Sequence, residues 1–153
     1  MEMSLPFLYN GLRAMNKAFE VIDHTADVGI IAYGVDIEEL FSNAALALFS
    51  LITELESIEN KFHFHLEVSG EDIDILLIEW LNELIYLFDV KHVLFNHFDI
   101  GSLTDNDLKA TCYGEHFDAE KHTMKVEVKA ATYHMLKLDK SDDGFKAQVI
   151  LDI

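Results

Sequence analysis

Residues 72–88, with the sequence DIDILLIEWLNELIYLF, are apolar on nearly every side of a helix. Only four residues mark a polar side of it: Asp74, Glu79, Asn82 and Glu83. A helix that is apolar nearly all round must be covered by other elements on most of its sides. We therefore expect a buried helix at the centre of the fold. Its acidic residues and its length exclude a membrane span.

A second amphipathic helix is predicted over residues 37–53. Asp36 offers a side-chain cap, and Glu39 lies three residues later, an arrangement typical of a helix start. Apolar residues recur at helical spacing after it: Leu40, Phe41, Ala44, Ala45, Leu48 and Ile52.

Strand-like runs surround the two helices. They cover residues 18–23, 28–33, 62–68, 93–100, 108–117, 133–138 and 145–151. Asp143-Gly144 supplies the turn of a final hairpin, because glycine tolerates the positive φ that a tight turn requires. This order predicts an α+β fold: a single compact domain with a mainly antiparallel sheet packed with two helices.

The 153 residues fit one domain, which we place at residues 15–153. Residues 1–14 contain the only proline and share no pattern with the strand-like run after them, so we expect a dispensable leader. Cys112 is the only cysteine and excludes an internal disulfide. Neither a signal peptide nor a membrane span is evident, so we expect a cytoplasmic protein without membrane association.

The formal net charge of −17 limits the partners that the chain can have. Nucleic-acid binding draws much of its affinity from lysine and arginine contacts to phosphates, so direct binding to RNA or DNA is not expected. An acidic chain can instead approach a basic enzyme through electrostatic steering.

His63 and His65 lie two residues apart in an alternating strand and therefore share a face. They could chelate a metal together, or they could simply form the polar half of that strand. No third ligand is evident, which favours the second interpretation.

Two further polar features are open to more than one interpretation. His24-Thr25-Ala26-Asp27 separates two apolar strands, and Asp152 lies beside the final carboxylate of Ile153. Asp27 could satisfy backbone donors in a turn, and the terminus could be solvated without a partner. If Asp27 came near Asp152, the oxygens would suit a hard cation such as Ca²⁺ or Mg²⁺.

At these residues the chain resembles the archease family. Five segments carry the resemblance: His24-Thr25-Ala26-Asp27-Val28-Gly29, Glu38-Glu39-Leu40-Phe41 with Asn43-Ala44-Ala45, Glu79-Trp80-Leu81-Asn82-Glu83-Leu84, Lys129-Ala130-Ala131-Thr132-Tyr133-His134 and Lys146-Ala147-Gln148-Val149-Ile150-Leu151-Asp152-Ile153. Each is weak alone, but five in order are specific. Phe145 stands where such sequences often place tryptophan.

The resemblance implies a compact α+β domain of strand-helix-strand-strand type. It also implies a non-catalytic partner of the RtcB-type tRNA-splicing RNA ligase, one that promotes ligase guanylylation and multiple turnover. A divalent cation, usually calcium, would be bound by Asp27, Asp152 and a main-chain oxygen of Ile153. His24, Lys129 and His134 are candidates for contacts with the ligase, against ordinary structural or solvated roles.

Two other functions compete with this one. The chain could be a chaperone or modulator of an RNA-modifying enzyme such as a tRNA methyltransferase. It could also be a metal-dependent hydrolase built on Asp27 and Asp152, but the sequence offers no evident base and substrate pocket beside them.

Overall fold

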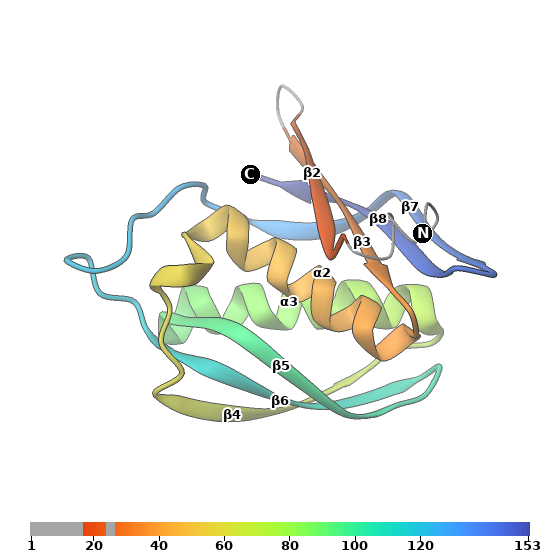
Figure 1. Cartoon of the computed structure of the whole chain (residues 1–153), viewed down its shortest axis with the longest axis horizontal. Helices are drawn as coiled ribbons and strands as arrows, with labels where there is room; N and C mark the ends of the chain where they lie inside the picture. The colour runs from red at the N-terminus through yellow and green to blue at the C-terminus, as the bar shows by residue number, and fades with distance from the viewer. Residues whose placement is uncertain (1–16, 24–26) are drawn as a thin grey trace, which may run out of the picture.

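The computed structural model describes residues 17–23 and 27–153, which form three layers. A four-stranded sheet and a three-stranded sheet enclose a layer of two helices (Figure 1). The fold class is as predicted. The strands, however, divide between two antiparallel sheets, which explains how the central helix can be apolar on so many sides.

Helix α2 spans Ile37–Ile52. Its cap is the predicted one, because Asp36 Oδ1 accepts a hydrogen bond from the Glu39 N–H at 2.8 Å. Glu39 in turn accepts a hydrogen bond from the Val35 N–H at 2.7 Å. The two acids thus fix the direction in which the chain enters the helix.

Helix α3 spans Ile73–Lys91 and is the buried helix that its sequence predicts. Its buried residues are Leu76, Leu77, Ile78, Trp80, Leu81, Leu84, Ile85 and Leu87. The Trp80 Nε1–H donates to the Phe41 carbonyl oxygen at 2.9 Å, which ties α3 to α2. The helix continues three residues beyond the predicted end and stops at His92, whose φ of 57° is left-handed.

The four-stranded sheet has the order β2-β3-β8-β7. Its strands are β2 (Phe19–Asp23), β3 (Asp27–Gly34), β8 (Gly144–Asp152) and β7 (Ala130–Ser141). The central strands β3 and β8 pair antiparallel and turn Ile30, Val149 and Leu151 toward the core. The predicted final hairpin joins β7 to β8, with Gly144 at a φ of 128°.

The three-stranded sheet has the order β4-β6-β5. Its strands are β4 (Phe62–Ser69), β6 (Asp107–His116) and β5 (Val93–Leu103). A short 3₁₀ helix, Leu55–Ser57, leads from α2 toward this sheet. Within the part of the chain that is described, no helix is long and apolar enough to cross a membrane. The proposed leader, residues 1–14, lies outside that part and stays a prediction.

Candidate cation site at the end of the four-stranded sheet

Asp27 and Asp152 are direct cross-strand partners in the β3–β8 pair. Residues directly opposite one another in an antiparallel ladder point to the same face, with Cβ atoms about 4.5–5.5 Å apart. The structure therefore brings together two acids that lie near opposite ends of the sequence. Ile153 comes directly after β8 and is 36% exposed.

The first residues of β7 complete this end of the sheet. Ala130 pairs with Asp152, and the Lys129 N–H donates to the Asp152 carbonyl oxygen at 2.8 Å. Asn82 of α3 fixes the next residue, because its Oδ1 accepts from the Ala131 N–H at 2.8 Å. The Asn82 Nδ2 donates to the Ala131 carbonyl oxygen at 3.2 Å, so the side chain binds both backbone groups of one residue.

The two aspartates are not neutralised by neighbouring side chains of the described chain. None of the ion pairs found among residues 17–23 and 27–153 includes Asp27 or Asp152. Two carboxylates on neighbouring residues of one sheet face repel each other unless a cation or a donor compensates. The oxygens of two carboxylates would suit a hard cation such as Ca²⁺, which takes oxygen ligands, better than Zn²⁺.

The described side chains do not complete a cation site alone. Across residues 17–23 and 27–153, no group of three or more His, Cys, Asp or Glu side chains is arranged to hold a metal ion. Because Ca²⁺ takes six to eight oxygens, the remaining ligands would be main-chain oxygens, water or atoms of a partner. The cation at this end of the sheet therefore stays a prediction.

The three predicted partner contacts have different outcomes. His24 falls in residues 24–26, which are not described. Lys129 is exposed, and its backbone N–H donates a hydrogen bond to the Asp152 carbonyl oxygen. His134 is also exposed but lies farther along β7, beyond the Thr132–Ile150 pair. Lys129 is thus adjacent to the aspartates, whereas His134 is separated from Asp152 by that pair.

His134 belongs to an irregular segment of β7 that the alternating sequence does not reveal. The regular pairing with β8 is interrupted between Thr132 and Lys137. Within the interruption, Met135 has a φ of 53° and is 58% exposed. A left-handed conformation is uncommon for a residue with a side chain like this one. The Gln148 side chain holds the segment by donating to the Met135 carbonyl oxygen at 2.9 Å.

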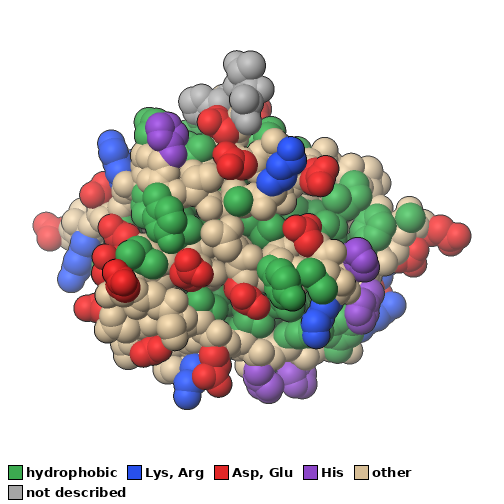
Figure 2. Space-filling view, turned by 180° about the vertical axis from the view of Figure 1, so that it is seen from behind, with side chains coloured by type: hydrophobic (Ala, Val, Ile, Leu, Met, Phe, Trp, Pro, Cys, Tyr) green, Lys and Arg blue, Asp and Glu red, His purple; other side chains and the backbone are tan. Residues whose placement is uncertain are grey.

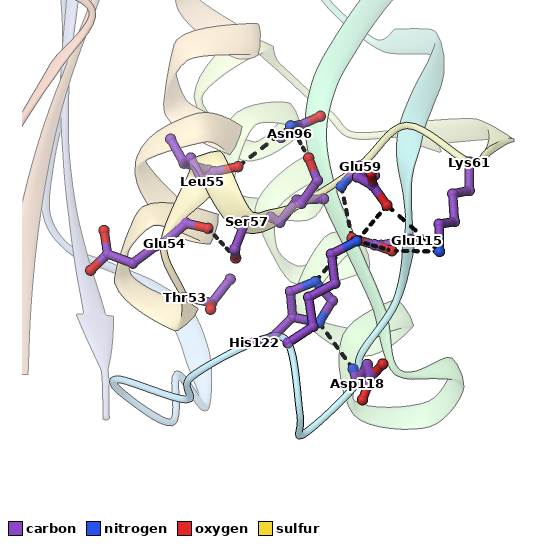
Figure 3. Close-up of polar contacts among 12 residues, drawn as sticks. Thr53, Glu54, Leu55, Ser57, Glu59, Lys61, Asn96, Glu115, Asp118 and His122 are labelled. Carbon is purple, nitrogen blue, oxygen red and sulfur yellow. Dashed lines mark hydrogen bonds and ion pairs between the residues drawn. The ribbon is translucent and has the colours of Figure 1, made fainter.

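A buried polar network supports the approach to β7, and no sequence pattern predicts it. The Glu115 side chain is only 4% exposed. It accepts hydrogen bonds from the Glu59 N–H at 2.7 Å, from His122 Nε2 at 3.0 Å and from Lys121 Nζ at 2.9 Å (Figure 3). Burial raises the pKa of Glu115, but these donors outweigh it and lower the pKa to about 2.

The network determines which ring nitrogen of His122 carries the hydrogen. Its Nδ1 accepts a hydrogen bond from the Asp118 N–H at 2.9 Å, so the Nε2–H is the group that donates to Glu115. His122 is 2% exposed and fully engaged by these contacts. No fixed sequence spacing signals such a cluster, because it forms only when β6 and the loop after it meet. We interpret it as structural.

The loop of residues 117–129 runs from this network past the end of α2 to the start of β7. Lys125 donates from its backbone N–H to the Ile52 carbonyl oxygen at 2.9 Å and from Nζ to the Ser50 carbonyl oxygen at 2.8 Å. The buried Thr53 hydroxyl donates to the Thr123 carbonyl oxygen at 2.8 Å. These bonds place Lys129 beside Asp152 at the start of β7.

Comparison with known protein families shows which family the chain belongs to. The model of the Archease protein family (MTH1598/TM1083) matches residues 19–153. The chain belongs to the archease family. Relatives called protein archease include one from Methanosarcina mazei, 38% identical over 144 residues, covering 92% of this chain and 99% of the relative. The archease of Pyrococcus furiosus is 43% identical over 142 residues, covering 90% and 99%.

Solved archease structures share the fold. The solution structure of Methanobacterium thermoautotrophicum protein 1598 superposes with a TM-score of 0.73 at 39% identity, covering 89% of this chain and 99% of that one. The crystal structure of a Thermotoga maritima archease, described as a possible chaperone, has a TM-score of 0.63 at 25% identity. It covers 86% of this chain and 94% of that one. The resemblance inferred from sequence is therefore confirmed.

Proposed function

We propose that this archease is a non-catalytic activator of an RtcB-type RNA ligase in tRNA splicing. In this role it promotes guanylylation of the ligase and restores its activity between ligations. The observation that carries the proposal is the cross-strand pair Asp27–Asp152, two acids facing each other at an exposed sheet end of an archease.

The chain's own residues have distinct roles in this proposal. Asp27, Asp152 and the main-chain oxygen of Ile153 hold a divalent cation, and Ca²⁺ fits their oxygens best. When bound, the cation supplies positive charge that can orient phosphate oxygens. Asn82 and the Lys129 N–H keep the start of β7 against Asp152, which preserves the geometry of the acids.

The charge of the chain supports a protein partner over a nucleic acid. Acidic side chains are spread across the face opposite to that of Figure 1, and lysines are fewer there (Figure 2). The net charge of −17 repels RNA but attracts a basic RNA-handling enzyme. The activator can therefore reach the ligase without competing for its substrate.

The test is ligation of a cleaved tRNA by its cognate RtcB-type ligase, with GTP, divalent metal and substrate in large excess over ligase. The wild-type chain is compared with Asp27→Asn and Asp152→Asn, which remove charge but preserve size. Asp105→Asn is the matched control, because Asp105 is exposed in the β5–β6 turn of the other sheet. We expect many turnovers with the wild type and the control, and about one turnover with either site variant.

Two results would overturn the proposal in different ways. Unchanged turnover on adding the wild-type chain would exclude ligase activation. Full activation by Asp27→Asn and Asp152→Asn would exclude the aspartate pair from the function.

A general chaperone role is the second candidate, because the Thermotoga maritima relative is described as a possible chaperone. In that case the chain would suppress aggregation of an RNA-modifying enzyme, such as a tRNA methyltransferase, without affecting ligation. Light scattering of the heated methyltransferase, with and without the chain, separates the two functions. Protection without any effect on ligation would favour the chaperone.

A further inference from the structure

The outer face of the three-stranded sheet carries two neighbouring histidines. His63 and His65 alternate with Phe62 and Phe64 along β4, so both project away from the helices. Their cross-strand partners on β6 are Tyr113 and Thr111. Both histidines are exposed, and this face lies on the sheet that does not contain Asp27 and Asp152.

The two imidazole rings are spaced as two ligands of one metal ion would be. Their centroids are 5.2 Å apart, and their planes make an angle of 64°. With metal–nitrogen bonds of about 2.0–2.1 Å and a tetrahedral angle, two coordinating rings have centroids roughly 5 Å apart. The observed centroid spacing therefore agrees with the spacing that coordination of one ion requires.

Thr111 prepares one of these rings for coordination. Its Oγ1 lies 3.1 Å from His65 Nδ1, which orients the ring and leaves Nε2 available. Histidine ligands commonly use their second nitrogen in this way, and such contacts strengthen metal binding.

His97 is the third histidine of the same face but is engaged differently. Its Nε2 lies 3.0 Å from Asp99 Oδ1, and its ring packs against Tyr113 at a centroid distance of 5.2 Å. Within the described ranges, no third His, Cys, Asp or Glu joins a metal-holding group. Among the described residues, His63 and His65 are thus the two side chains available to an ion here, and water would supply its other ligands.

We propose that His63 and His65 form a chelating site for a divalent transition-metal ion. Imidazole nitrogens suit Zn²⁺, Cu²⁺ and Ni²⁺, whereas Ca²⁺ requires oxygen ligands. The site is thus chemically distinct from the aspartate pair at the far sheet, and it does not depend on the proposed ligase function.

The test is titration of the full chain with Cu²⁺ in excess Ca²⁺, monitored by calorimetry and by electron paramagnetic resonance. Calcium occupies oxygen sites, so that copper reports on nitrogen ligands. We expect one ion per chain and a nitrogen hyperfine pattern from two imidazoles. His63→Ala and His65→Ala should each weaken binding by at least about tenfold.

His97→Ala is the matched control, because it removes an exposed histidine from the same face and leaves the pair intact. Its copper affinity should equal that of the wild type. Circular dichroism verifies that each variant is folded. The proposal is wrong if His63→Ala and His65→Ala bind copper as the wild type does, or if His97→Ala weakens binding as much as they do.

Discussion

Replacing Glu115 by glutamine tests whether the buried network holds the loop of residues 117–129. Glu115 Oε2 accepts hydrogen bonds from the Glu59 N–H and from His122, and its carboxylate also pairs with Lys121 and, at 3.5 Å, with Lys61. A glutamine oxygen can keep the first two bonds. Its NH₂ group would then face two ammonium groups with no acceptor to offer them.

The expected loss of stability can be worked out from these contacts. Hydrogen bonds to charged groups contribute about 1.5–3 kcal/mol each, and breaking a buried pair costs about 3–5 kcal/mol. Lys121 is 31% exposed and can still reach Glu59, which reduces the cost. We therefore expect Glu115→Gln to lower the free energy of unfolding by about 3 kcal/mol, and Tm by about 6–12 °C.

The fluorescence of Trp80 provides the assay, because Trp80 is the only tryptophan and is 0% exposed. Urea unfolding at pH 7 gives the free energies of the wild type, Glu115→Gln and Glu59→Gln. Glu59→Gln is the matched control: its side chain is 62% exposed although it pairs with the same lysine. An exposed pair contributes little to stability, so Glu59→Gln should lower the free energy of unfolding much less than Glu115→Gln.

The pH dependence gives an independent test of the same residue. The folded-state pKa of Glu115 is lowered to about 2, from a reference value of 4.5. Its ionised form therefore stabilises the fold fully above pH 4.5, and this contribution is lost as the pH falls toward 2. The free energies of unfolding of the wild type and Glu115→Gln should therefore become more similar as the pH falls over that range. Equal losses from Glu115→Gln and Glu59→Gln at pH 7, or a constant difference down to acidic pH, would refute the reasoning.

Three other variants or reactions test the fold more widely. Asp36→Ala removes the cap that accepts the Glu39 N–H, and should lower the free energy of unfolding by about 1 kcal/mol in urea titrations, whereas Asp36→Asn should lose less. Cys112 is buried, which raises its pKa to about 12. A thiol reagent should therefore label it only after unfolding, and rapid labelling of the native chain, detected by mass spectrometry, would contradict this. Gly114→Ala would place a Cβ 1.8 Å from the Leu94 carbonyl oxygen, and the variant should give little folded protein by circular dichroism, whereas a native spectrum and Tm would disprove the close approach.

The sequence predicts the helices well because their signals are local. Asp36 and Glu39 mark the start of α2. The apolar residues on most sides of α3 predict its central position. The predicted end of α3 falls too early, because no glycine marks it and His92 adopts the left-handed conformation instead. The division into two sheets is not predictable in this way, since alternation shows that a strand is half-buried but not which strand it joins.

The candidate site is only partly accessible to sequence reasoning. Asp27 and Asp152 can be proposed from their types, but the β3–β8 register that makes them partners is a long-range property. The interruption of β7 at Met135 leaves the residue pattern unchanged and gives no sequence signal. Glu115 and His122 also give no sequence signal. Their burial depends on how the loop of residues 117–129 crosses the fold.

The β3–β8 ladder also determines when during folding the aspartates can meet. β8 follows β7 in the chain but lies between β3 and β7 in the sheet, so β3 and β7 are not connected through the sheet until β8 has formed. Closing such a long loop has an entropic cost that only the finished core offsets. During synthesis, the backbone N–H and C=O groups of β3 that pair with β8 stay without these partners until β8 has been made. Juxtaposition of Asp27 and Asp152 is therefore a late folding event, and a ligand that needs both acids distinguishes a chain in which β8 has paired with β3 from one in which it has not.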